Sequence, residues 1–309
     1  MAIYLERLRQ LNIVPDSMES SPAFVSAASG LLHVYDNFYV IDDDSMSLAC
    51  FPDAADQGGQ RYRLLDGALP HHPADRKKSK PDLESICFLE PEMFPPFGAI
   101  LAVPSGSKAN RMRGALAIFT KPGLLAAKAL PIDFSPLFLE LTKRFSDLNI
   151  EGCVIANGQL HLLQRGNGPT QQNALVRLNL EPALQSIKSQ QSLEPSVLLS
   201  AREMALGALR GVNLSFTDSA CIKATETWFL AVAEDIRSTY EDGRYCGAVL
   251  GCFNQRDEII FQEELLCPEK PEGICLLHGG ERPLFVVVTD ADDPLRPSIM
   301  YRGTLGTQV

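Results

Sequence analysis

Short apolar segments rich in β-branched and aromatic residues alternate with polar turns along nearly the whole chain. Residues 99–103 and 284–288 are examples. Segments of this length and composition are typical of β-strands, because branched and aromatic side chains pack well on a pleated surface. Residues 136–145 instead predict a short helix, and the polar stretches 70–80 and 185–194 are predicted to be surface loops.

One short phrase recurs along the chain at intervals of about 60 residues. It consists of an acidic or hydroxyl residue, a small residue and then apolar residues. It begins at Ser29, Glu84, Glu151, Asp218 and Glu272. After each phrase come a turn, a second apolar strand, a polar loop and a third apolar strand, and several units show a fourth. Each unit is therefore a four-stranded meander, which is the blade of a β-propeller.

The repeat predicts an all-β fold, a five-bladed β-propeller formed by residues 1–309 as a single domain, with six blades as the main variant. The last unit stops after its third strand, and residues 3–8 at the N-terminus have the alternation of a strand that would complete it. This pairing would close the ring and remove two exposed edges. The rival fold is a two-sheet sandwich, which gives no reason for an acidic residue at successive strand starts.

The predicted topology brings the repeated residues together. In an antiparallel meander the first strand begins at the edge of the sheet where the second strand ends. The five phrase residues are therefore predicted at the floor of one channel mouth, surrounded by the loops that follow each second strand. Those loops contribute the candidate site residues Asp42, Asp44, Lys108, Asn110, Arg111, Arg113, Arg165, Asn167, Glu234, Arg237, Asp290 and Asp292.

Carboxylates that share a narrow channel repel one another, so they must raise their pKa values, pair with cations or hold a metal ion. Oxygen ligands without His or thiolate favour Ca²⁺ or Mg²⁺ over zinc or copper. We therefore predict a site for one of these ions formed by Ser29, Glu84, Glu151, Asp218 and Glu272. The alternative is a channel filled with water, in which Arg or Lys side chains pair with the acids.

The order of these five residues, one in each blade, resembles that of the soluble calcium-activated nucleotidases (apyrases), and the Glu-Gly strand starts are similar to those of phytase-like and esterase-like phytase propellers. The resemblance implies a five-bladed propeller with one Ca²⁺ in its channel. This chain differs from the nucleotidases at Asp218, where they have a serine. The nucleotidases also act in secretory compartments rich in Ca²⁺.

Basic residues in the predicted loops extend this chemistry. Arg111, Arg113 and Arg165 can bind phosphate in a bidentate manner, and Asn167 follows in the same loop as Arg165. We therefore predict a metal-dependent hydrolase of phosphate esters or anhydrides that acts on a small anionic substrate. The alternative function is a non-enzymatic propeller that binds a ligand or a protein partner. A lactonase or sugar esterase is a third option, but a clear Asn pair is lacking.

Composition narrows the choice of partners and compartment. The chain has 28 Lys and Arg against 38 Asp and Glu, a net charge of −10, and no basic run that could follow a nucleic acid. Charges near the N-terminus are unlike a secretory peptide and no apolar run reaches the ~20 residues of a membrane helix, so we predict a cytoplasmic protein without membrane contact. Cysteines in apolar runs, Cys87, Cys153, Cys221 and Cys275, are predicted to be buried free thiols.

Overall fold

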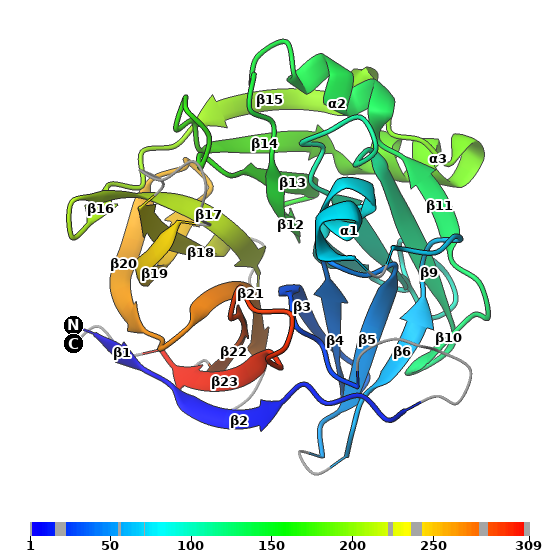
Figure 1. The fold of residues 1–309 in the computed structure, drawn as a ribbon. Coiled ribbons are helices and arrows are strands. Elements are labelled where there is room, and N and C mark those ends of the chain that lie inside the picture. Colours follow the sequence, from blue (N-terminus) through cyan, green and yellow to red (C-terminus); the bar gives the residue numbers. More distant parts are fainter. Residues whose placement is uncertain are drawn as a thin grey trace.

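The computed structural model describes residues 2–15, 23–54, 57–70, 72–221, 225–235, 243–277 and 284–305. Five sheets, antiparallel except for one parallel pair of strands at the outer edge of a sheet, stand around a central axis, so the prediction of a five-bladed β-propeller is confirmed (Figure 1). The innermost strands contact one another in a closed ring, in the order β3, β7, β12, β17, β21 and back to β3.

Blade one contains β3 (Ala28–Val34), β4 (Asn37–Asp42), β5 (Ser47–Pro52) and β6 (Gln60–Arg63). Blade two contains β7 (Leu83–Leu89), β8 (Ala99–Pro104), β9 (Arg113–Lys121), β10 (Leu124–Leu125) and β11 (Leu130–Asp133). Blade three contains β12 (Ile150–Ala156), β13 (Gln159–Gln164), β14 (Ala174–Asn179) and β15 (Leu198–Glu203). Blade four contains β16 (Ala208–Leu209), β17 (Val212–Ala220), β18 (Glu226–Asp235), β19 (Arg244–Asn254) and β20 (Ile259–Leu266). Blade five contains β21 (Lys270–Leu277), β22 (Leu284–Asp290), β23 (Ile299–Thr304) and β2 (Glu6–Gln10).

The N-terminal segment joins three blades. β1 (Ile3–Tyr4) pairs with β20 of blade four, and β2 pairs with β23 as the outer strand of blade five. Beyond β2, Leu11 packs in the core between blades five and one, and Ile13 forms a bridge to Gly59. The predicted closure of the ring by the N-terminus is therefore confirmed. It removes the unpaired edge that blade five would otherwise present.

The hydrophobic core is divided into five clusters, one between each pair of neighbouring blades. Apolar side chains from both faces of every blade enter these clusters, which explains the nearly unbroken apolar runs of strands such as β8 and β22. The largest cluster lies between blades two and three. The ring is stabilised by burial between its sheets, so each blade depends on both neighbours.

The helices lie outside the sheets. The predicted helix at 136–145 is confirmed as α2 (Ser135–Leu141), but the loop predictions for 70–80 and 185–194 were wrong. Residues 70–80 contain α1 (Pro73–Ser79), and α3 (Leu180–Gln190) covers most of the second stretch, followed by the 3₁₀ turn η1 (Pro195–Val197). α3 buries Ala183, Leu184 and Ile187 at the edge of blade three.

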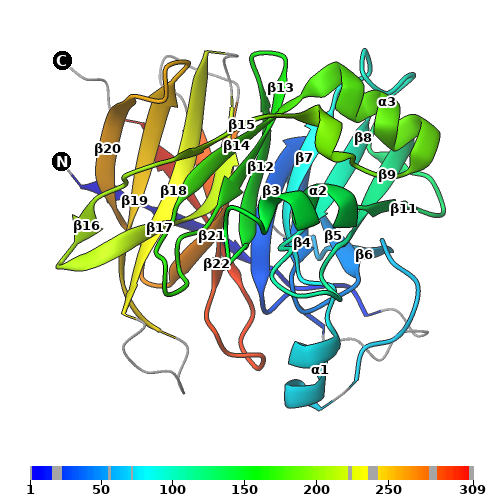
Figure 2. The same cartoon turned by 90° about the horizontal axis from the view of Figure 1, so that it is seen from above.

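Helix α1 is short, polar and set apart from α2 and α3, and it projects from one face of the disc (Figure 2). None of the helices in the described part of the chain has the length and apolar character needed to cross a membrane. Cys87, Cys153 and Cys275 are buried, whereas Cys221 is half-buried.

Candidate functional site

Every innermost strand carries a β-bulge, which lies near the start of the strand in four blades and past the middle of β17 in blade four. In the register of these strands the residues without a direct partner are Ser29 with Gly30, Glu84, Glu151, Thr217 and Glu272. A bulge bends its strand and redirects a side chain. The start of each of these strands lies opposite the end of the second strand, as for Ala28 and Asp42, which confirms the predicted meeting of the two edges.

The repeat was aligned one residue too late in blade four. The bulged residue there is Thr217, and Asp218 occupies the next position, where the other inner strands have Gly30, Ser85, Gly152 and Gly273. These residues are small because the inner strands approach closely. A Cβ atom on Gly273 would lie 2.7 Å from the carbonyl oxygen of Ser29. The acidic residue of blade four is therefore not equivalent to the glutamates of the other blades.

Asp218 is a structural residue at the axis of the propeller. Its carboxylate accepts hydrogen bonds from the Ile274 backbone N–H at 2.8 Å and from the Ser85 hydroxyl at 3.2 Å. Burial raises the pKa of Asp218 well above its usual range, although these hydrogen bonds act in the opposite direction. Asp218 thus links blades four, five and two, and it does not line the channel mouth.

The channel mouth is an open well of about 1050 Å³. Its lining in the described residues includes eleven Asp or Glu and eight Lys or Arg side chains, so acidic groups are in excess by three. Helix α1 contributes to its wall, which places the mouth on the face from which α1 projects (Figure 2). A volume of this size accommodates a small organic ligand.

The structure brings most of the predicted residues together. The well is lined by Ser29, Asp42, Asp44, Glu84, Lys108, Arg111, Glu151, Arg165, Asn167, Glu272, Asp290 and Asp292. Four other residues that were predicted at the mouth lie outside its lining. They are Asp218, Asn110, Arg113 and Glu234. Arg113 is exposed at the start of β9, and Asn110 is occupied by hydrogen bonds to the carbonyls of Lys78 and Lys80. Arg237 lies outside the described residues.

Arg165 is the centre of one group of buried charges, the Arg165 cluster, formed by Arg165, Lys270, Glu151, Glu234 and Glu272. The guanidinium of Arg165 lies 3.3 Å from Glu151, 2.5 Å from Glu234 and 3.7 Å from Glu272. The ammonium of Lys270 lies 3.1 Å from Glu272 and 3.4 Å from Glu234. The acids of blades three, four and five are therefore paired with cations. This pairing agrees with the alternative in which Arg and Lys side chains, and not a metal ion, neutralise the acids of the channel.

Two carboxyl groups of this cluster have opposite pKa shifts. Burial, with a contribution from nearby Glu272, raises the pKa of Glu151 to about 8 despite the attraction of Arg165. Burial also acts to raise the pKa of Glu234, but Arg165 and Lys270 outweigh it and lower that pKa below its usual value. Glu151 consequently holds its proton near neutral pH while Glu234 is ionised.

A second group, the Glu84 cluster, lies between blades one and two and consists of Asp43, Asp82, Glu84 and Lys80. Oxygen atoms of the three acids all lie within 4.8 Å of one another. Lys80 contacts Asp43 and lies 3.1 Å from Asp82, whose other oxygen accepts a hydrogen bond of 2.6 Å from Arg111. Glu84 is 7% exposed and has no hydrogen bond or ion pair with any residue that the structure describes.

The charge of the Glu84 cluster is not balanced. Burial raises the pKa of Glu84 well above its usual range, and the neighbouring acids Glu151, Asp82 and Asp43 raise it further. The pKa of Asp43 is raised to about 7, again mainly by burial, with Lys80 acting against the shift. Glu84 therefore keeps its proton, and Asp43 is about half protonated at pH 7, unless another cation joins them.

Helix α1 forms a basic rim beside the Glu84 cluster. Arg76 donates a hydrogen bond of 2.7 Å to the carbonyl of Asp44, and Arg111 donates one of 3.0 Å to the carbonyl of Lys77. Arg76 and Lys77 line the well together with Lys108 of the loop between β8 and β9. The helix is thus held over the mouth between two loops of neighbouring blades.

The sequence prediction missed Asp43, Lys80, Asp82 and Lys270. Three of these stand two or four residues before a phrase glutamate, in the series Lys80, Asp82, Glu84 and in the pair Lys270, Glu272. Alternate residues of an extended segment point to the same side, so this spacing was a readable signal. Extending the phrase toward the N-terminus by that rule would have found them.

Comparison with known families decides the membership of this chain. The model of the family described as "Family of unknown function (DUF6929)" matches residues 24–305. The chain belongs to the DUF6929 family. A search of curated proteins found no match.

Solved structures resemble this DUF6929 chain in fold. A protein from Parabacteroides distasonis that is provisionally assigned as a glycoside hydrolase matches with a TM-score of 0.52 at 12% identity, over 96% of this chain and 95% of that protein. The glutaminyl cyclase of Myxococcus xanthus matches at 10% identity with a TM-score of 0.48 over 99% of both chains. The tail fiber of Staphylococcus aureus phage P68 matches at 10% identity with a TM-score of 0.44, over 98% of this chain, which spans 53% of that fiber. At these identities the likeness shows the fold alone.

Proposed function

We propose that the protein is a divalent-cation-dependent hydrolase of phosphate esters or anhydrides, acting in the well. The observation that carries this proposal is the position of Glu84. Its carboxyl is buried beside Asp43 and Asp82 and has no partner in the described part of the chain. A buried carboxyl without a partner is costly, and a bound cation would remove that cost.

The residues of the Glu84 cluster suit a hard cation. Asp43, Asp82 and Glu84 offer oxygen atoms only, which Ca²⁺ and Mg²⁺ prefer. When all are ionised, these three acids and Asp44 bring four negative charges against the two positive charges of Lys80 and Arg111. A divalent ion would compensate this difference. Glu84 thus remains a proposed ligand, while Glu151 and Glu272 of the predicted set are engaged by Arg165.

When bound, such an ion polarises a phosphoryl oxygen and lowers the pKa of a water molecule. The chain's own residues would do the rest. Arg76 and Lys108 on the rim would attract the anionic substrate and orient it toward the Glu84 cluster. Glu151, which lines the same well with a pKa of about 8, would hold a proton for the leaving group.

The corrected register of β17 changes one point of the resemblance to the calcium-activated nucleotidases. They have a serine where Asp218 was aligned, and the corrected register puts the hydroxyl residue Thr217 at that position. Thr217 is nevertheless buried, and its hydroxyl donates a hydrogen bond of 3.0 Å to the carbonyl of Pro271. Its hydroxyl therefore serves the fold, and the ligands proposed here come from blades one and two.

The proposal is tested by measuring ion binding and turnover separately. Calorimetric titration with Ca²⁺ and Mg²⁺ should show saturable binding, with a rise in melting temperature that a chelator reverses. p-Nitrophenyl phosphate and a nucleoside triphosphate should be hydrolysed only with the ion present. Glu84→Gln should abolish both effects, whereas Glu181→Gln on the exposed side of α3 should change neither.

The outcomes separate the two predicted functions. Ion binding without turnover on phosphate, nucleotide and lactone substrates would reject the hydrolase and leave a non-enzymatic platform for a ligand or partner. Absence of ion binding would reject the proposal itself. Arg76→Ala should weaken turnover about tenfold without loss of ion binding, because its charge meets the substrate and not the ion.

A further inference from the structure

A second cavity lies between blades three and four, at the other end of the inner strands. Glu151, the second residue of strand β12, lines the well, and the strand ends at Ala156, which lines this cavity about 16 Å further along. We call it the inter-blade cleft. It measures about 220 Å³ and is lined by ten residues.

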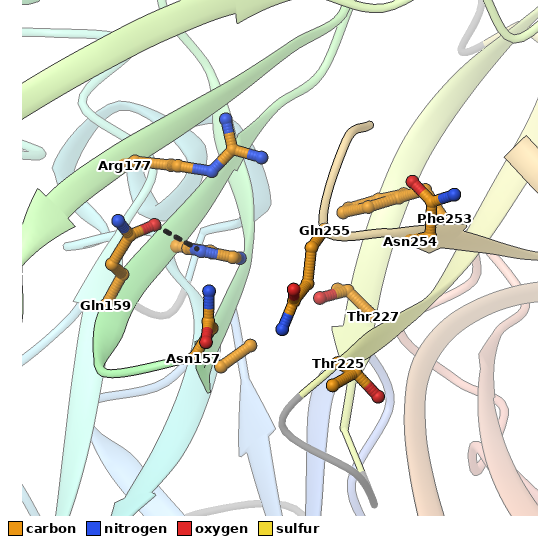
Figure 3. A pocket seen from close by; sticks show the side chains of 10 residues that line it. Asn157, Gln159, Arg177, Thr225, Thr227, Phe253, Asn254 and Gln255 are labelled. Atoms are coloured by element: carbon orange, nitrogen blue, oxygen red, sulfur yellow. Dashed lines mark hydrogen bonds between the residues drawn. The ribbon is translucent and has the colours of Figure 1, made fainter. Parts of the chain in front are cut away.

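The two walls of the inter-blade cleft come from different blades. Figure 3 shows Asn157, Gln159 and Arg177 on one side and Thr227 and Gln255 on the other, with the amide of Gln255 pointing into the space between them. Ala156 and Phe253 add apolar surface. The cleft is therefore small, lined mainly by hydrogen-bonding groups and distinct from the well.

The charged side chain in the lining of the inter-blade cleft is paired. Arg177 is its one ionic side chain in the described residues, and both terminal nitrogens of Arg177 are bound by the buried carboxylate of Asp257, one of them at 3.0 Å. Arg202 supports that carboxylate from outside at 3.0 Å. Two guanidinium groups thus share one carboxylate, and each of them already has a carboxylate partner.

Several polar groups of the cleft lack partners among the residues that the structure describes. The side chains of Asn157, Thr227 and Gln255 make no hydrogen bond with any described residue, and the buried Nδ1 of His161 has none either. The ring of His161 is 4% exposed and interacts through Nε2 with Gln159 at 3.3 Å. Burial, together with the nearby charge of Arg177, lowers the pKa of His161 to about 4. The ring is therefore neutral, and one of its nitrogens can accept a hydrogen bond.

We propose that the inter-blade cleft binds a small neutral polyhydroxyl compound, of the size of a monosaccharide or smaller. Amide, hydroxyl and neutral imidazole groups all accept or donate hydrogen bonds, and hydroxyl groups of a sugar can do both. The volume is below that of a typical drug-sized pocket, which limits the ligand to one ring or a short polyol. The site is independent of the ion and of the chemistry proposed for the well.

The test uses the full chain and defined probes. Glucose, galactose, myo-inositol and sorbitol are titrated by calorimetry and by saturation-transfer NMR, with gluconate and glucosamine as charged counterparts. At least one neutral probe should bind saturably, and its charged counterpart should bind about tenfold more weakly or worse, because a charge would be buried without a partner.

Variants place the binding in the cleft. Gln255→Ala and Gln159→Ala should each weaken binding about three- to tenfold through loss of a hydrogen bond. Gln255 is exposed, so its variant should fold normally. Gln185→Ala on the surface of α3 is the matched control and should leave the affinity unchanged, as should Glu84→Gln in the well. Failure of every neutral probe to bind, equal binding of the charged probes, or unchanged affinity in both cleft variants would overturn the proposal.

Discussion

The two groups of carboxylates in the well are buried to a similar degree but differ in their partners. In the Arg165 cluster three glutamates surround two cations, and one of the acids keeps its proton, so the charges balance. In the Glu84 cluster Lys80 and Arg111 meet Asp43 and Asp82, and Glu84 is left over. The Arg165 cluster therefore stabilises the fold without a further cation, whereas the Glu84 cluster can accept one more positive charge.

Removal of Arg165 should have the largest effect on stability. Arg165→Met would leave Glu234 and Glu272 buried with only Lys270 as a cation, and breaking a buried ion pair in this way costs about 3–5 kcal/mol. Urea unfolding of the variant and the parent protein measures this loss. An equally stable variant would show that the cluster contributes nothing to the fold.

The two buried lysines provide a matched comparison, because the side chains of Lys80 and Lys270 are 9% and 10% exposed. In the presence of a chelator, Lys80→Met and Lys270→Met should each lower the free energy of unfolding by about 2–3 kcal/mol, because each substitution removes the cation with which buried carboxylates pair. Ca²⁺ should restore the stability of Lys80→Met but not of Lys270→Met. Equal rescue of both variants would contradict the distinction between the clusters.

The pH dependence of stability should report on Glu151. Its pKa of about 8 in the folded protein lies above the ordinary value of a glutamate, so its contribution to stability is present at acid pH and is lost as the pH rises toward 8. One such group gives a slope of at most about 1.4 kcal/mol per pH unit. Glu151→Gln should flatten the urea-unfolding profile between about pH 5 and 8, while the response to Ca²⁺ persists. An unchanged profile would rule out a protonated Glu151.

The smallest change in stability is expected for Glu84→Gln. An amide resembles the protonated carboxyl, so without divalent ions the variant should differ from the parent by less than about 1 kcal/mol. Its melting temperature should no longer respond to Ca²⁺ or Mg²⁺. If the response survived, Glu84 would not be a ligand, and the unbalanced charge of its cluster would need another explanation.

Much of the fold and part of the site could be predicted from the repeated phrase. Glu84, Glu151 and Glu272 were correctly placed at one channel mouth, because strand alternation and the up-and-down connections determine which edge a residue occupies. Arg113 was predicted to lie in the loop at the channel mouth, but it is the first residue of β9. A polar residue between a loop and a strand can belong to either, and its sequence position does not distinguish the two. Residues 185–194 were taken for a loop because their polar side chains face outward on α3, which buries only a narrow apolar stripe.

The amino-acid order alone determined the number of blades, the closing strand and the concentration of acids at one end of the channel, since each follows from local periodicity and chain connectivity. Which acids became partners of which cations was decided only by the tertiary structure. The bulge of β17 falls on Thr217, so Asp218 takes the following position, where it supports the axis and is not a member of the ring. Asp43, Glu84 and Arg165 belong to blades one, two and three, and their distances depend on how the sheets pack. Because electrostatic energies in a buried well change steeply with distance, no spacing in the sequence could show that Glu84 would lack a partner among the described residues.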